Sequence, residues 1–128
     1  MLSVSAAYHY FLYRGITDFR SGFDSLSGLV RAELDKDPTL GDVFIFFNRK
    51  RNQVKLLHFE GDGFALYHKR LESGTYEVPD ASVSEGGQAA ISSDELLFIL
   101  KGIKLRSIER RARFNLKKHS EKIGQKLA

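Results

Sequence analysis

Residues 43–71 read VFIFFNRKRNQVKLLHFEGDGFALYHKRL, and this stretch decides the fold. It holds three runs rich in apolar and aromatic residues, separated by two short polar turns; the runs are 43–47, 53–59 and 64–71. The second turn contains two glycines, which can adopt the positive φ that tight hairpins need. Runs joined by short turns pair antiparallel, so the stretch predicts a three-stranded meander. The first run is apolar at every position, which indicates a buried, central strand.

One strand and one helix are predicted before the meander. The aromatic run 10–13 (YFLY) is typical of a short strand, which Gly15 ends. Apolar residues then recur at intervals of three and four from Phe23 to Leu34, which predicts a helix over about residues 22–35. Ser21 and Asp24 have the spacing of a capping box and are expected to begin this helix.

A second helix is predicted after the meander. Residues 80–90 are small and polar and are expected to form a connector. Ser92 and Glu95 make a better capping box than Ser21 and Asp24, and an apolar helix over about 93–102 follows. We therefore expect an α+β fold, in which an antiparallel sheet of three to five strands is packed by two helices. The predicted organisation is a loose N-terminus (1–9), one domain (10–103) and a basic helical arm (104–128).

Composition excludes several classes of protein. The chain has 128 residues, enough for one domain, and contains no Cys. Disulfides, thiolate metal sites and a cysteine nucleophile are therefore excluded. No apolar run approaches the roughly 20 residues that span a bilayer, and the first residues lack the pattern of a signal peptide. We expect a cytoplasmic protein with no membrane partner.

Charge is distributed unevenly along the chain. Residues 1–100 carry ten Lys and Arg against fourteen Asp and Glu, whereas residues 101–128 carry ten against two. In the C-terminal segment, the apolar residues from Leu105 to Leu127 form one narrow helical stripe and the remaining face is basic. Such an arm either binds an acidic partner, most commonly nucleic acid, or is a solvated tail.

A second group of cations is predicted to lie at one end of the sheet. In a meander, the turn after the first strand and the end of the third strand lie at the same end, which would gather six Lys and Arg. Phosphate contacts of this kind give affinity without reading sequence. Together with the arm, the candidate DNA-binding residues are Arg49, Lys50, Arg51, Lys55, Lys69, Arg70, Arg106, Arg110, Arg111, Arg113, Lys117 and Lys118.

No set of residues indicates catalysis or a cofactor. The nucleophile-elbow, phosphate-loop and dinucleotide-binding patterns are absent from the sequence. His58 and His68 lie on neighbouring predicted strands and could face each other as metal ligands, but a third ligand is missing. The carboxylates lie at turns and helix starts, where they have structural uses. We expect no enzyme, no cofactor and no metal site.

Five motifs, in this order, carry a family resemblance: TDFR (17–20), FDSL (23–26), DVFIFFNR (42–49), KLLHFEGDGF (55–64) and YHKRLE (67–72). The chain resembles the TnpB accessory proteins of insertion sequence 66 (IS66) elements over about residues 10–102. It does not resemble the RNA-guided nuclease of the same name, which is longer and carries zinc-binding cysteines. The motif residues that carry over are Thr17, Asp18, Arg20, Asp24, Asp62, Gly63, Lys69 and Arg70. The basic arm lies beyond the usual match.

The resemblance implies a small bacterial protein that is required for transposition, a DNA recombination reaction, beside a separate DDE transposase. We predict a non-enzymatic accessory protein that contacts DNA, the transposase or both. One alternative is a protein-only adaptor, whose arm stripe binds the transposase or a second copy in a homo-oligomer. The other is a metal-dependent nuclease that uses Asp18, Asp24 or Asp62.

Overall fold

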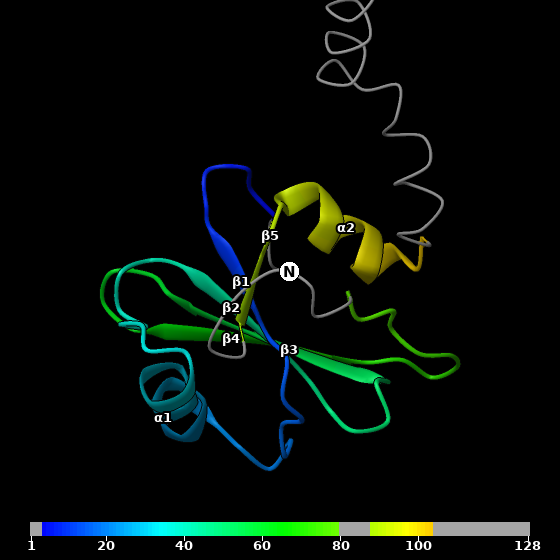
Figure 1. The fold of residues 1–128 in the computed structure, drawn as a ribbon, viewed down its shortest axis with the longest axis horizontal. Coiled ribbons are helices and arrows are strands. Elements are labelled where there is room, and N and C mark those ends of the chain that lie inside the picture. Colours follow the sequence, from blue (N-terminus) through cyan, green and yellow to red (C-terminus); the bar gives the residue numbers. More distant parts are fainter. Residues whose placement is uncertain (1–3, 80–87, 104–128) are drawn as a thin grey trace, which may run out of the picture.

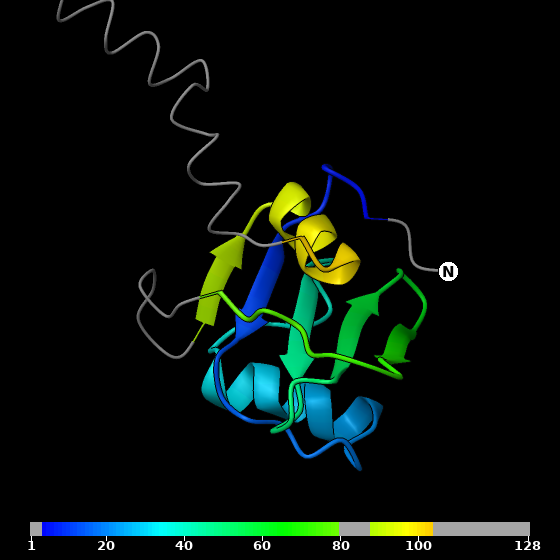
Figure 2. The same cartoon turned by 90° about the vertical axis from the view of Figure 1, so that its right-hand side faces the viewer.

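Five strands form one sheet in the computed structural model, which describes residues 4–79 and 88–103. The elements, in chain order, are β1 (Tyr10–Tyr13), α1 (Phe23–Glu33), β2 (Val43–Phe47), β3 (Gln53–Phe59), β4 (Phe64–Arg70), β5 (Gln88–Ile91) and α2 (Ser93–Lys101). The strand order is β4-β3-β2-β1-β5, and the two helices lie on opposite sides of the sheet (Figures 1 and 2). The α+β class is therefore confirmed. The predicted arm 104–128 lies outside the described residues.

The predicted meander is confirmed. β2, β3 and β4 pair antiparallel, with Phe47 opposite Val54 and Phe59 opposite Phe64. β2 lies at the centre of the sheet and is buried along its whole length, as its apolar sequence indicated. In the β3–β4 turn, Gly61 has φ +94°, and the Glu60 N–H donates to the Gly63 carbonyl over 2.8 Å. A glycine at this position has no side chain to strain the turn.

The sheet differs from the prediction at its other side, because it is mixed. β1 runs parallel to β2, with Tyr10 opposite Val43. α1 lies between these two strands in the chain, and parallel neighbours need such a crossover. β5 pairs antiparallel with β1. The first three residues of β5 belong to the predicted connector 80–90, whose small and polar side chains gave no strand pattern.

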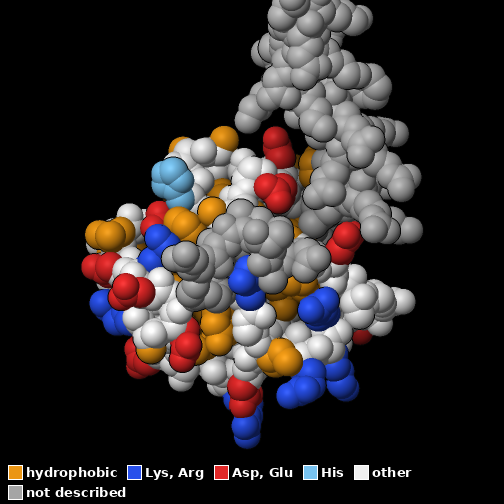
Figure 3. Space-filling model, viewed as in Figure 1, with side chains coloured by type: hydrophobic (Ala, Val, Ile, Leu, Met, Phe, Trp, Pro, Cys, Tyr) orange, Lys and Arg blue, Asp and Glu red, His pale blue; other side chains and the backbone are white. Residues whose placement is uncertain are grey.

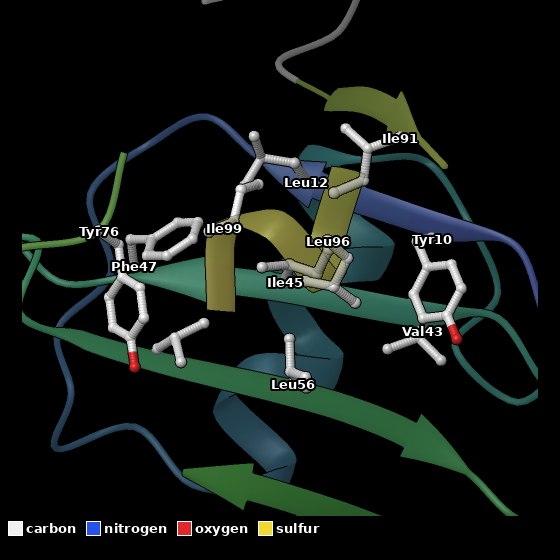
Figure 4. Packing of buried hydrophobic residues seen from close by; sticks show 11 residues of the cluster. Tyr10, Leu12, Val43, Ile45, Phe47, Leu56, Tyr76, Ile91, Leu96 and Ile99 are labelled. Carbon is white, nitrogen blue, oxygen red and sulfur yellow. The ribbon is translucent and has the colours of Figure 1, made fainter. Parts of the chain in front are cut away.

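Each side of the sheet packs against one helix. Leu96 and Ile99 of α2 pack with Ile45 of β2 and Leu56 of β3 on the α2 side, and Figure 4 shows this cluster. On the α1 side, buried residues of α1 pack with the alternate residues of β2 and β3; the cluster is Leu26, Val30, Leu34, Phe44, Phe46 and Leu57. Because both sides of β2 are covered, all five of its residues are buried. No helix among the described residues is long and apolar enough to cross a membrane.

The two helix starts differ in how well the sequence predicted them. At α2, the Glu95 N–H donates to Ser92 Oγ (3.1 Å) and the Ser92 N–H donates to Glu95 Oε1 (3.2 Å), so the capping box is confirmed. Gly102, with φ +75°, ends this helix. At α1 the prediction is wrong, since the N-cap is Gly22 and no side chain caps the helix. The carbonyl of Ser21 binds a lysine instead, as described below.

Candidate nucleic-acid interface

Basic side chains gather at one end of the sheet, where the β2–β3 turn meets the end of β4. Gln53 lies opposite Arg70, and the Leu71 N–H donates to the Asn52 carbonyl over 2.8 Å. We call this surface the basic end; it consists of Arg49, Lys50, Arg51, Lys69 and Arg70. Figure 3 shows Lys and Arg side chains gathered over the β2–β3 turn, at the lower right of the view. The structure therefore brings together five of the six predicted sheet cations.

The turn 48–52 is held in one conformation by two asparagines. Asn48 Oδ1 accepts hydrogen bonds from the backbone N–H groups of Asn52 (3.1 Å) and Gln53 (3.0 Å). Asn48 Nδ2 also donates to Asn52 Oδ1 over 2.7 Å. From outside the turn, the Tyr76 N–H donates to the Arg51 carbonyl over 2.7 Å. The backbone that carries the three cations of the turn is thus fixed before any ligand arrives.

The cations of this turn are open to solvent. Arg49, Lys50 and Arg51 are exposed, and none of them forms an ion pair with a carboxylate in the part of the chain that the structure describes. At the end of β4, Arg70 lies 3.4 Å from the carboxylate of Glu72, with both side chains mostly exposed. Lys69 is exposed on the α2 side, since it lies opposite Val54. Exposed cations without a carboxylate partner, such as those of this turn, can bind the phosphates of a nucleic-acid backbone.

Lys55 lies apart from the basic end. Its side chain is on the α1 side and only 5% exposed. The ammonium donates to the carbonyls of Phe19 (2.9 Å) and Ser21 (2.6 Å) and lies 4.9 Å from the centre of the Phe19 ring. Burial lowers the pKa of Lys55, against the opposing attraction of Asp18. Lys55 anchors the loop 17–21 to the sheet, and we leave it out of the interface.

The motif residues Thr17, Asp18 and Arg20, in the loop 17–21, form hydrogen bonds or an ion pair within the fold. Thr17 is buried, and its N–H donates to the Phe47 carbonyl over 3.2 Å. The Arg20 guanidinium lies 2.6 Å from Asp18 and, by hydrogen bonding, lowers the pKa of this carboxyl to about 2. The Arg20 N–H also donates to Asp18 Oδ1. The carboxylate of Asp18 is therefore engaged within its own loop.

The described residues do not assemble a metal site. Asp18 lies in that loop, Asp24 in the first turn of α1 and Asp62 in the β3–β4 turn, so the three lie on different segments. No group of three or more His, Asp or Glu residues suited to a metal occurs in residues 4–79 and 88–103.

His58 and His68 do not face each other, because they lie opposite Ala65 and Lys55 and so on opposite sides of the sheet. The ring of His58 packs against Tyr8, with the centroids 4.6 Å apart. His68 Nε2 lies 2.8 Å from Gln53 Oε1. The expectation that His58 and His68 could face each other as metal ligands is therefore wrong.

Sequence reasoning missed two neighbours of the basic end. Arg14 follows β1, which runs parallel to β2, and it lines a hollow of about 100 Å³ together with Arg49 and Arg51. Lys101, at the end of α2, lines a second hollow of about 210 Å³ with the segment 71–76 that follows β4. The last described residues before the arm therefore lie beside the segment that is bonded to the turn 48–52. No sequence pattern indicated that Arg14 or Lys101 lies near the basic end, because their positions depend on how elements distant in the sequence pack together.

The fold and the basic end define a small α+β protein with an exposed cationic surface. The chain matches the family model described as "IS66 Orf2 like protein" over residues 8–110, and it belongs to this family. The family indicates an accessory role in transposition of IS66 insertion sequences. The match runs past residue 103, so the expectation that the arm lies wholly beyond it is wrong.

The chain is similar in sequence to two proteins of Sinorhizobium fredii (strain NBRC 101917 / NGR234). The chain is 39% identical over 89 residues to "Uncharacterized protein y4hO", which covers 70% of this chain and 75% of the relative. It is 30% identical over 94 residues to "Uncharacterized protein y4jC", which covers 73% and 78% respectively. No solved structure matches the chain.

Proposed function

We propose that this protein is a non-enzymatic accessory factor in transposition that contacts DNA phosphates through its basic end. The observation that carries the proposal is the turn 48–52, where three exposed cations stand on a backbone fixed by Asn48. A fixed turn loses little conformational freedom on binding, so more of the electrostatic attraction remains as affinity. Phosphate contacts of this kind position a protein on the duplex without selecting a sequence.

The C-terminal arm extends the same proposal. Residues 104–128 contain nine Lys and Arg and two Glu. The last residues of α2 and Gly102 line a hollow with the segment 71–76, which is bonded to the turn 48–52 of the basic end. We include the arm's cations Arg106, Arg110, Arg111, Arg113, Lys117 and Lys118 in the proposed contact.

The transposase of the same element is the proposed protein partner. An accessory factor has to act together with the enzyme that cuts and joins the DNA, and family membership supports this association. A chain that binds no DNA would fit a protein-only adaptor, in which the transposase is the direct contact.

Fluorescence anisotropy of a labelled duplex at several salt concentrations tests the DNA contact. We compare the full-length chain with the double variant Arg49→Gln/Arg51→Gln in the turn. A matched double variant, Arg31→Gln/Lys36→Gln, removes the same charge from α1 and the residues after it. If each arginine of the turn contacts a phosphate, the first variant weakens binding and lowers the slope of log K against log salt by about 2. The matched variant is expected to change the slope much less.

Two results would contradict the proposal. Equal effects of both double variants would mean that overall charge matters and the turn does not. No binding to any duplex at low salt would exclude direct duplex contact. The arm is tested separately with Arg110→Gln/Arg111→Gln in the full chain.

A further inference from the structure

β4 forms an open edge of the sheet. The strand order begins with β4, which pairs only with β3 among the elements that the structure describes. β4 has seven residues and contains neither a Pro nor a bulge, two of the features with which proteins protect exposed edges. Its charged residues, Lys69 and Arg70, lie together at one end of the strand and leave residues 64–67 uncharged. Such an edge can accept a further strand by backbone hydrogen bonding.

The ladder determines which groups of β4 point outward. The Glu60 N–H donates to the Gly63 carbonyl and the Leu71 N–H donates to the Asn52 carbonyl, so the odd-numbered residues bond to β3. Bonded and non-bonded pairs alternate in an antiparallel ladder. The backbone N–H and C=O groups of Phe64, Leu66, His68 and Arg70 therefore point away from the sheet.

The side chains along this edge are complementary to a reversed copy of themselves. Phe64 and Leu66 are half-buried on the α1 side, at the border of the core cluster there. One end of the edge carries the exposed carboxylates of Glu60 and Asp62, and the other carries Lys69 and Arg70. An antiparallel second copy would bring the acidic end of one molecule beside the basic end of the other.

We propose that two copies of this chain pair through β4, antiparallel and with a two-fold axis at Leu66. In this register, Leu66 meets Leu66 of the second copy, and Phe64 lies opposite His68. Asp62 in the turn then lies beside Arg70. All the outward backbone groups of residues 64–68 find partners, and the two sheets become one. The two 48–52 turns lie at opposite ends of this sheet, and their cations Arg49, Lys50 and Arg51 remain free to bind separate segments of DNA.

A second copy is favoured over an unrelated peptide because the charge pattern is self-complementary. An edge that binds an acidic peptide is expected to carry positive charge along its whole length. The charge of this edge is instead negative at Asp62 and positive at Arg70. The proposal does not depend on DNA binding, and its test uses the protein alone. Failure of dimerisation and failure of DNA binding are therefore distinguishable.

Sedimentation equilibrium of the full-length chain over a range of concentrations measures the dimer directly. His68→Pro removes an outward N–H without removing a bond to β3, and an edge strand tolerates Pro at such a position. We expect this variant to weaken the dimer about tenfold or more, since two N–H donors are lost per dimer. The matched variant His68→Ala keeps the N–H and is expected to dimerise like the wild type. Circular dichroism checks that both variants are folded.

Charge reversal tests the register. Asp62→Lys and Arg70→Glu alone each place like charges together at two symmetric contacts, so each is expected to weaken the dimer about tenfold. The double variant Asp62→Lys/Arg70→Glu restores opposite charges and is expected to restore the dimer. A chain that stays monomeric at about 100 µM, a concentration that would saturate a micromolar dimer, overturns the proposal. A dimer that is equally strong in His68→Pro and His68→Ala also overturns it.

Discussion

Replacing Lys55 by Met separates the structural role of this lysine from the DNA-binding role that its sequence suggests. Methionine keeps most of the apolar stem and removes the ammonium. The two bonds to the carbonyls of Phe19 and Ser21 are lost, as is the contact with the Phe19 ring. The loop 17–21 then has no anchor to β3 through this side chain.

The expected loss follows from two opposing effects. Hydrogen bonds from a charged donor contribute about 1.5–3 kcal/mol each, so the two bonds together contribute about 3–6 kcal/mol. Burial of the ammonium, which lowers the pKa of Lys55, opposes part of this gain. We expect Lys55→Met to lower the free energy of unfolding by about 2 kcal/mol, and DNA affinity to stay unchanged under conditions where the protein is folded.

Urea unfolding and amide hydrogen exchange measure the first effect, and duplex anisotropy measures the second. The matched control is Lys69→Met, an exposed lysine on the neighbouring strand, which is expected to change stability by less than about 0.5 kcal/mol. Exchange in Lys55→Met should become faster mainly in residues 17–21. If the two variants were equally stable, or if Lys55→Met lost DNA affinity without losing stability, the anchoring role would be refuted.

Three further changes test other parts of the structure. Ser92→Ala removes the acceptor of the Glu95 N–H and is expected to cost about 1 kcal/mol in urea unfolding, against a smaller loss for Ser93→Ala; equal losses would contradict the cap. Asn48→Ala removes the acceptor of two backbone N–H groups and is expected to cost about 1–2 kcal/mol and to weaken duplex binding, with Asn52→Ala milder in both assays. The pKa of Asp18 is lowered to about 2 from an ordinary 3.8, so its contribution to stability is present above about pH 4 and is lost as the pH falls through about 2. The difference in stability between the wild type and Asp18→Asn should therefore shrink as the pH falls through about 2 and be lost below it; a difference that keeps its full size below this pH would refute the pairing with Arg20.

Sequence alone predicted the parts of the fold that depend on neighbouring residues. The meander from Val43 to Arg70 follows from apolar runs and short turns, and β3 has the predicted bounds. The capping box of α2 was also predicted, because its two partners lie three residues apart. The basic end itself was foreseen, since antiparallel strands joined by short turns place the turn 48–52 beside the end of β4.

Tertiary structure decided whatever depends on contacts between distant segments. Period-two patterns show which side of a strand is buried but not which strand lies beside it, so the parallel pairing of β1 with β2 was not predictable. The same limit hid Arg14, which reaches the basic end only because of that pairing. For the same reason, the sequence suggested that Lys55 is a surface cation. In the structure the loop 17–21, more than 30 residues earlier in the chain, covers this side chain. A charged side chain is buried only where acceptors arrive from elsewhere in the fold, and only the folded chain brings them there.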